Sequence, residues 1–331
     1  MKSSFRPYLV NLLCLAAALA LSVAVGPVLI PPGTLLRILA NGLPGIAIQP
    51  DWPENFATIV QQVRLPHAIL ILLTGAALGG SGATYQGVFR NPLADPFVIG
   101  ASGGASLGAV LAIITGSGPV MLWAFVGAVT AVLLVYGLAE SSGGQSSTIH
   151  LLLAGAALST LLSSSVSLLM FLHDRNLHEM LAWLMGGLSG RSWQHLGSAA
   201  PLILFGIVGL WLLARPLDAL TFGEQAAQSL GLDLRRARMA IVGLAALVTA
   251  AAVSTAGIIG FVGLLAPHAA RLLVGGAHAR VIPTSALIGG LLLLLADDLA
   301  RTVAAPVELP VGILMALLGA PFFLWLLRRK A

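Results

Sequence analysis

The chain has 331 residues, of which 58% are hydrophobic and 9% charged, with 38 glycines and a single cysteine. Soluble domains carry about 25% charged residues, so this composition excludes a water-soluble enzyme. One cysteine excludes an intrachain disulfide and a cysteine-built metal cage. We interpret the net charge of +5 as basic loops of a membrane protein. The chain has too little polar surface for a nucleic-acid-binding face, so no nucleic-acid partner is expected.

Uncharged stretches long enough to cross a bilayer follow one another along the chain. A hydrocarbon core of about 30 Å needs about 20 apolar residues in a helix. The stretch 96–139 is interrupted by Gly, Ser and Pro at 115–119 and therefore predicts two helices, so simple counting gives nine spans. The stretches are 7–36, 65–89, 96–139, 141–173, 192–214, 239–270, 281–296 and 309–327.

The basic residues favour ten spans over nine. Cytoplasmic loops of membrane proteins are enriched in Lys and Arg, and nine spans would leave the basic C-terminus outside. Glycines at 257, 260 and 263 allow the stretch 239–270 to break in two, which places both termini inside. Twelve of the 17 basic residues then lie inside, and five lie outside: Arg37, Arg64, Arg175, Arg191 and Arg301. We expect an all-α integral membrane protein with about ten transmembrane helices and one domain over 1–331.

The segment RNPLADPFVIGASGGASLG (90–108) predicts a sharp turn at the membrane surface. Pro92 and Pro96 exclude a continuous helix there. The next span opens with small residues, including Gly104 and Gly108, and the preceding span carries glycines at 75, 79, 80 and 82. This pattern predicts a close-packed hairpin of the two spans, or a gate at the cytoplasmic mouth.

The segment RPLDALTFGEQAAQSLGLDLRRAR (215–238) is the longest inside loop. Good helix formers run from Glu224 to Leu230, and Gly231 suits a helix C-terminus. We expect a short helix along the membrane surface on which a partner docks.

The sequence shows no clear pattern typical of other membrane proteins, such as ion-coupled carriers or membrane enzymes. Ion-coupled carriers favour acids in mid-span, whereas Asp95, Asp297, Asp298 and Glu308 fall near predicted span ends. The chain has no HExxH metal motif and no GxxxxGK[ST] nucleotide motif. The seven histidines form no constellation, so no metal, no cofactor and no catalytic residue are expected.

Several motifs, in this order and spacing, make the chain resemble the FecCD-type permeases of ABC importers for siderophore-bound iron, haem and cobalamin. The resemblance covers nearly the whole chain from Arg64 to the C-terminus. The motifs are RLPH (64–67), SGATYQGVFRNPLADPFVIGASGGASLGA (81–109), GEQAAQSLGL (223–232), GIIGFVGLLAPHAARLLVG (257–275), PTSALIGG (283–290), LADDLAR (295–301), ELPVGI (308–313) and LGAPFF (318–323).

The resemblance implies type II importer architecture and a set of partners. Two copies of the permease would form a homodimer above two cytoplasmic ATPase subunits, and a substrate-binding protein would deliver cargo from outside. The loop 215–238 matches the family's coupling helices, which contact the ATPase. The coupling residues implied are Gly223, Glu224, Ala227, Leu230 and Gly231.

The resemblance also assigns the external arginines and a gate. Arg64 and Arg301 match positions that meet glutamates of the binding protein, and His67 stands where a second arginine is usual. Such charge pairs steer docking more than they add affinity. Because histidine titrates near neutrality, the His67 contact is expected to be weaker or pH-dependent. Membrane snorkelling is the alternative role for both arginines. The cytoplasmic gate is implied at Asn91, Leu93 and Thr148.

The sequence thus predicts a permease subunit that imports a metal chelate across a bacterial inner membrane by ATP-driven alternating access. An iron–siderophore complex, haem and cobalamin all remain open as cargo. The permease itself would hydrolyse nothing, because ATP hydrolysis belongs to the partner. The alternative is a gradient-driven secondary transporter with repeated halves, which the two Pro/Gly-interrupted segments around 90–104 and 257–267 support.

Overall fold

The computed structural model describes residues 6–26, 28, 30–42, 48–141, 148–305 and 307–330, and this part of the chain is helical, without strands. The α-helices are α1 (Arg6–Ala24), α2 (Pro32–Asn41), α3 (Glu54–Thr58), α4 (Leu65–Val88), α5 (Ala101–Thr115), α6 (Val120–Ser141), α7 (Thr148–Leu172), α8 (Leu177–Leu184), α9 (Trp193–Leu212), α10 (Ala214–Thr221), α11 (Glu224–Ser229), α12 (Leu234–Ala256), α13 (Val262–Val274), α14 (His278–Val303) and α15 (Val311–Lys330). Two short helices of other types are η1, a π-helix (Ile59–Arg64), and η2, a 3-10 helix (Asp174–Asn176).

Six helices of the described chain are long and apolar enough to cross a membrane. Four more apolar helices are shorter, with 10–17 residues. The six are 54–88, 120–139, 149–172, 193–212, 234–256 and 278–303, and the four are 9–24, 101–115, 262–274 and 311–325.

The predicted helix breaks are confirmed. The stretch 96–139 splits into α5 and α6 at 116–119, and the stretch 239–270 splits into α12 and α13 at 257–261. Gly257 and Phe261 both adopt positive φ in the second break, which a regular right-handed helix does not permit. The chain turns between α4 and α5 as its two prolines predict.

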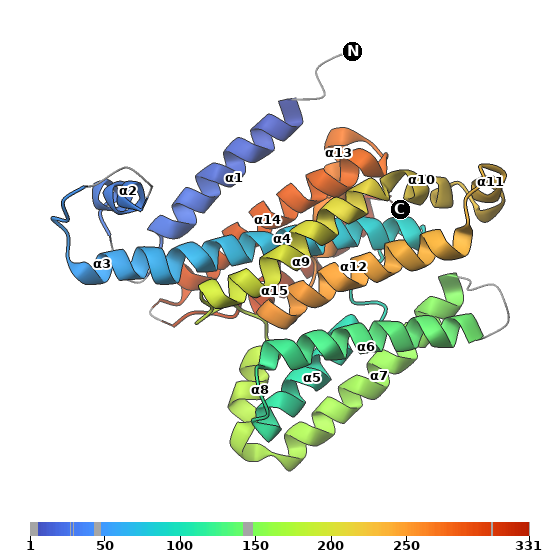
Figure 1. Ribbon diagram of the computed structural model, residues 1–331, viewed down its shortest axis with the longest axis horizontal. Coiled ribbons are helices and arrows are strands. Elements are labelled where there is room, and N and C mark those ends of the chain that lie inside the picture. The colour runs from blue at the N-terminus through green and yellow to red at the C-terminus, as the bar shows by residue number, and fades with distance from the viewer. Residues whose placement is uncertain are drawn as a thin grey trace.

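The helix α4 lies at the centre of the larger of two helical groups (Figure 1). It packs along α14 and also contacts α9, α12 and α13. A Cβ on Gly75 would overlap the carbonyl of Gly289, and one on Gly79 would overlap the carbonyl of Ser285. Glycines thus let the α4 and α14 backbones touch, which is the usual means of close packing where lipid removes the hydrophobic drive between helices.

The helices α5, α6, α7 and α8 form the second group, below the first in Figure 1. Here Gly104 and Gly108 of α5 meet the backbone of α6 at Gly127 and Trp123. The predicted hairpin of two glycine faces is therefore wrong, because the glycines of α4 face α14 while those of α5 face α6. The twelve-residue connection between α4 and α5 (89–100) carries the chain from one group to the other, so each face meets a different partner.

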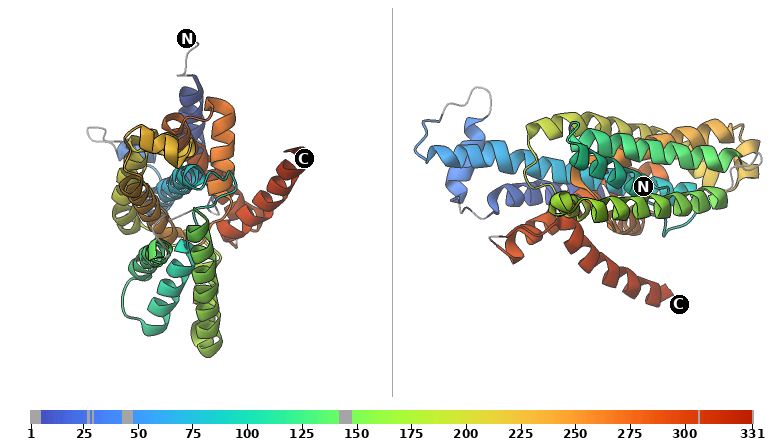
Figure 2. Two further views of the ribbon diagram at one scale, coloured as in Figure 1. Left: turned by 90° about the vertical axis from the view of Figure 1, so that its right-hand side faces the viewer. Right: turned by 90° about the horizontal axis from the view of Figure 1, so that it is seen from below.

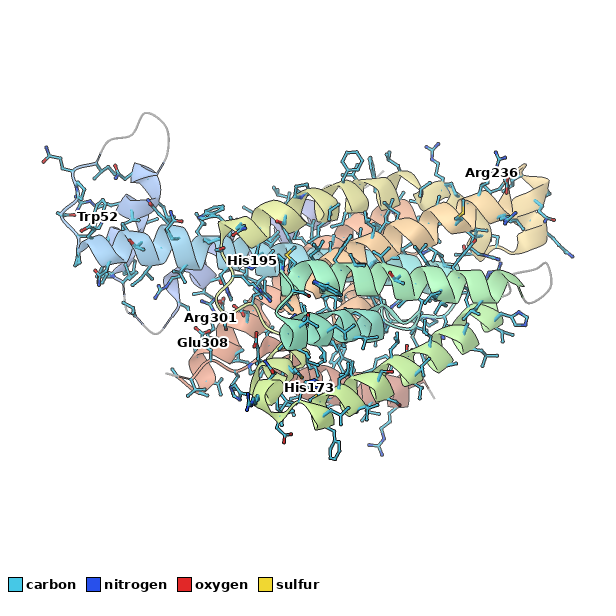
Figure 3. The ribbon with its side chains drawn as sticks, turned by 60° about the horizontal axis from the view of Figure 1, so that its bottom comes forward. Trp52, His173, His195, Arg236, Arg301 and Glu308 are labelled. Atoms are coloured by element: carbon cyan, nitrogen blue, oxygen red, sulfur yellow. The ribbon has the colours of Figure 1, made fainter. Side chains whose placement is uncertain are left out.

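The two ends of the long axis carry different elements. The helices α10 and α11 lie at one end, and α2 and α3 at the other (Figure 1). Trp52, just before α3, and Arg236, near the start of α12, mark these opposite ends in Figure 3. The last helix, α15, contacts α13 and α14 and then diverges from the rest of the molecule (Figure 2).

Candidate functional site

The three residues predicted to dock a binding protein come together in one buried polar cluster. Arg64 closes η1 and His67 lies in the first turn of α4, whereas Arg301 lies near the end of α14. Their exposed fractions are 5%, 8% and 8%, respectively. The cluster joins the α2–α3 end of α4 and α14 to the last turn of α1.

Arg64 holds the C-terminus of α1. Its Nη1 donates to the carbonyl oxygens of Val23, at 3.1 Å, and Ala24, at 2.9 Å, and its Nη2 donates to that of Val28. The last carbonyls of a helix have no intrahelical donor, and a cation there also suits the helix dipole. The arginine therefore caps α1 from another helix.

Arg301 connects the same end of α1 to two carboxylates of its own helix. Its Nε lies 2.9 Å from Asp297 Oδ2, and its Nη2 lies 2.5 Å from Asp298 Oδ1 and 2.8 Å from Ser22 Oγ. The Nε2 of His67 lies 2.8 Å from Asp297 Oδ2, so the same carboxylate joins α4 to α14. Buried charges are stable in this form because each has partners.

The structure adds Asp297, Asp298 and Ser22 to the predicted set. The two acids precede the end of α14 by more than a turn and are 4% and 7% exposed, so they belong to the packed interior. Their spacing of four and three residues before Arg301 places all three on one helix face, a signal already present in the sequence. Docking by Arg64, His67 and Arg301 stays a prediction. In this structure all three side chains point into the protein.

The predicted coupling residues lie on and beside α11, which begins at Glu224 and ends at Ser229, close to the predicted bounds. Gly223 and Gly231 flank it with φ of 119° and 78°, values that favour glycine. Ala227 is fully buried, whereas Leu230 is 75% exposed. The side chain of Glu224 lies outside the described part of the chain.

Phe222, directly before this helix, is 81% exposed and was not predicted from the sequence. Together with Leu230 it places large apolar side chains at the surface on both sides of α11. Two such exposed apolar side chains beside one short helix favour a protein partner over solvent.

The predicted gate residues Asn91 and Leu93 lie in the turn between α4 and α5, and both are exposed. The Asn91 Oδ1 accepts a hydrogen bond from the Leu93 backbone N–H at 2.9 Å, which fixes the turn. The same turn reaches α7, because a Cβ on Gly155 would overlap the Val98 carbonyl. Thr148 opens α7, but its side chain lies outside the described part.

Asp95 in this turn is partly buried. Burial raises the pKa of its carboxyl to about 6, and the hydrogen bond from the Phe97 backbone N–H, 2.9 Å from Oδ1, lowers the pKa in part. Burial disfavours the charged form of a carboxyl, so this group exchanges a proton closer to neutrality than an ordinary aspartate.

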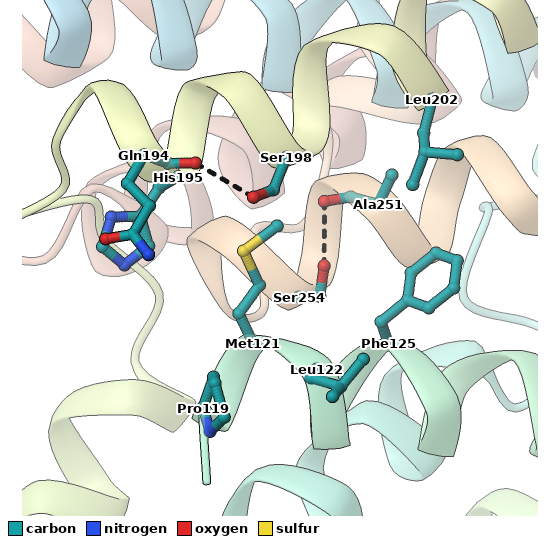
Figure 4. Close-up of a pocket in the computed structure, with 10 residues that line it drawn as sticks. All are labelled: Pro119, Met121, Leu122, Phe125, Gln194, His195, Ser198, Leu202, Ala251 and Ser254. Atoms are coloured by element: carbon teal, nitrogen blue, oxygen red, sulfur yellow. Dashed lines mark hydrogen bonds between the residues drawn. The ribbon is translucent and has the colours of Figure 1, made fainter.

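A hollow of about 480 Å³ lies between α6, α9 and α12, where the two helical groups meet (Figure 4). Its hydroxyls are satisfied within their own helices, since Ser198 donates to the Gln194 carbonyl at 3.0 Å and Ser254 to the Ala251 carbonyl at 3.1 Å. His195 is the titratable side chain among its described lining residues, and Met121, Leu122, Phe125 and Leu202 make much of the rest apolar. The described lining of this hollow therefore offers few polar groups that are not already hydrogen-bonded within the protein.

Comparison with known proteins assigns nearly the whole chain to one protein family. A model of the FecCD transport family matches residues 14–329. The cobalamin import system permease protein BtuC of Halobacterium salinarum is 42% identical over 98% of this chain and 90% of that protein. The hemin transport system permease protein HmuU of Yersinia pestis is 41% identical over 81% of this chain and 82% of that protein.

A solved structure is similar over almost the full length. It shows an ABC transporter described as metal-chelate type, in an inward-facing conformation. The TM-score is 0.81 at 31% sequence identity, covering 96% of this chain and 98% of that chain.

Proposed function

The chain belongs to the FecCD transport family, and on that premise we propose that it is the transmembrane permease subunit of an ABC importer for a metal chelate. The observation that carries this proposal is the match over nearly the full length, in sequence to permeases of cobalamin and hemin systems and in fold to a metal-chelate type transporter. The apolar helices supply the membrane-spanning body that such a subunit needs.

The proposal includes the topology of the chain. The six long apolar helices and the four shorter ones together form ten spans, with both termini, α10 and α11 in the cytoplasm. The positive-inside tendency supports this orientation, because Arg235, Arg236 and Arg238 lie at the α11 end of the molecule. The whole chain then forms one permease domain in the plasma membrane, with 215–238 as its cytoplasmic coupling loop.

The proposal also includes three partners. An ATPase pair would contact α11, where Phe222 and Leu230 are exposed, and would hydrolyse the ATP. A binding protein would dock at the α2–α3 end, where the cluster of Arg64, His67 and Arg301 holds the end of α1 in place. A second copy of the permease would complete the pathway, since α7 and α15 each pack against few neighbours within this chain.

Transport follows from alternating access. Closure of the ATPase pair would move α11, and the turn between α4 and α5 that contains Asn91 and Leu93 would open or close the cytoplasmic mouth. The largely apolar hollow in Figure 4 agrees with a permease that leaves the choice of cargo to its binding protein.

The test is reconstitution of the permease with its ATPase and binding protein in liposomes. Uptake of haemin, cyanocobalamin or ferric citrate should require ATP and the binding protein. Uptake that needs an ion gradient and ignores ATP would overturn the proposal in favour of a secondary transporter. Replacing Glu224–Gly231 by a Gly/Ser linker should release the ATPase on a sizing column, and retained complexes would contradict the coupling assignment.

Docking requires a test that separates contact from folding. Arg64→Ala should weaken binding-protein affinity because the end of α1 loses its cap, and Arg37→Ala is the control for an exposed exterior arginine. Affinity should be read together with the melting temperature of the permease alone. Unchanged affinity in a destabilised Arg64→Ala permease would remove the docking assignment.

A further inference from the structure

The short helix α10, which precedes α11, is hydrogen-bonded to the start of one long helix and to the segment that follows another. The Asp218 Oδ1 accepts the backbone N–H of His278 at 3.0 Å and lies 2.6 Å from the His278 Nδ1. The Arg90 Nε donates to the Leu220 carbonyl oxygen at 2.9 Å. The first two contacts join α10 to the start of α14, and the third joins it to the chain just beyond α4.

Asp218 caps α14 from a different helix. The first N–H groups of a helix lack intrahelical acceptors, and a side chain at the N-cap position normally supplies one. In α14 the N-cap is Ala277, which has no side-chain acceptor, and His278 is the first helical residue. The carboxylate of Asp218 takes this place and also suits the positive end of the helix dipole.

The His278 ring fills the space between three helices. Its side chain is 6% exposed, and a Cβ on Gly87 of α4 would lie 2.6 Å from its Nε2. The same Cβ would lie 3.0 Å from a methyl carbon of Leu217 on α10. Because Asp218 accepts at Nδ1, this nitrogen carries the proton and the ring is held in one orientation. Any movement of α10 therefore presses on α4 and α14 directly.

The element that contacts the ATPase has few other routes to the membrane body. Among the described contacts, α11 packs chiefly on α10 and on the start of α12. In contrast, α14 packs along α4 and carries Asp297 and Arg301 of the polar cluster at its far end. With 26 residues at about 1.5 Å each, α14 is about 39 Å long and carries one site near each end.

We propose that Asp218 and His278 are positioning residues that transmit movement of the coupling helix to α14 and α4, so that ATP hydrolysis is converted into transport. This inference rests on the proposed function. The coupling residues on α11 would receive the movement of the ATPase, and the contact between Asp218 and His278 would pass it on to α14.

The experiment measures cargo molecules transported per ATP hydrolysed by the complete complex in liposomes. The probe is whichever of haemin, cyanocobalamin and ferric citrate the wild-type complex takes up. Asp218→Ala removes both hydrogen bonds, so the complex should assemble and hydrolyse ATP while the ratio falls about fivefold or more. Asp218→Asn should keep most of the ratio, because its amide oxygen still accepts the His278 N–H.

Two further variants separate transmission from stability. Ser192→Ala removes the N-cap of α9 at the opposite end of the molecule, so it should lower the melting temperature but keep the ratio. His278→Ala keeps the cap on α14 and removes only the ring, so its ratio should fall even if Asp218→Ala does not fold.

Three results would overturn the inference. They are a wild-type ratio in Asp218→Ala, a wild-type ratio in His278→Ala, and an equal loss in Ser192→Ala. A wild-type complex that takes up none of the three probes with ATP would instead overturn the proposed function itself.

Discussion

The buried charges at the end of α14 lie in pairs whose partners are set by helical spacing and by a second helix. Arg301 follows Asp297 by four residues and Asp298 by three, so one helix face carries all three. His67 on α4 then shares Asp297, and Ser22 on α1 shares Arg301. These buried groups thereby hold three helices together, and Asp297, Asp298 and Arg301 each have a partner of opposite charge.

Arg301→Ala should destabilise the folded permease by about 3–5 kcal/mol, because it leaves two buried carboxylates without their cation. The melting temperature in detergent measures this loss. Arg37→Ala is the matched control, since Arg37 pairs with Asp51 at the surface with 46% and 60% of the two side chains exposed. An exposed pair contributes about 0–1 kcal/mol. Equal shifts in the two variants would contradict the structural role of the cluster.

Asp95 should make stability depend on pH. Its pKa is about 6 in the folded protein against 3.8 as the ordinary value, so the folded state binds more protons between these two values. Stability is therefore greatest below about pH 4, falls as pH rises through about 6, and stays lowered above it. At about pH 7.5 Asp95→Asn should be more stable than wild type by about 3 kcal/mol, as the difference between the two pKa values implies, and at about pH 4 the two should melt alike. A constant difference across this range would contradict the assignment.

At the scale of helices, glycine decides which faces meet. The α4–α14 contact places Gly75 against the backbone of Gly289, and the α5–α6 contact places Gly104 against the backbone of Gly127. Both contacts occur between helices that present small residues at intervals of about one turn. The same pattern on α4 and α5 predicted a contact between these two helices that the fold does not make.

Gly75→Ala should separate α4 from α14 and lower stability by about 1–3 kcal/mol, because the added methyl group meets a backbone carbonyl rather than a flexible side chain. Gly243→Ala in α12 is the control, since a Cβ there has nothing within 4 Å. The control should be neutral or slightly stabilising, as alanine favours helices. Thermal melting compares them, and a neutral Gly75→Ala would show that the two helices can separate without cost.

At the scale of the whole molecule, the proposed topology predicts which ends are accessible from each side. Glu54 at the start of α3 and Gln225 in α11 are both exposed and lie at opposite ends of the long axis. In a Cys14→Ser background, Glu54→Cys should react with an impermeant maleimide on intact cells. Gln225→Cys should react only after the membranes are opened. The permease is expressed without its partners, so that no ATPase covers α11.

Labelling of Gln225→Cys on intact cells would reverse the orientation, and labelling of both sites from one side would require an even number of spans between them. Either result would contradict the ten-span proposal while leaving the family assignment unaffected. The native Cys14 is free and exposed, so its removal keeps the background clear.

The order of helices and their breaks could be predicted from the sequence, because apolar length, Pro92, Pro96 and the glycines from 257 act locally. The helix Glu224–Ser229 with its flanking glycines was predicted for the same reason. The motifs likewise predicted the family, which the comparison confirms. The exposed Phe222 was missed, since burial depends on residues distant along the chain.

By itself, the sequence determined that this protein is a helical membrane permease, in which order most of its long apolar helices follow one another, and which residues could carry function. Only the tertiary structure decided which helices touch, that Arg64, His67 and Arg301 point inward, and that Asp218 caps a helix 60 residues further along. The physical reason is range. Apolar length, proline and glycine act within one or two turns, whereas a buried carboxylate or a glycine face finds its partner only when distant segments pack together.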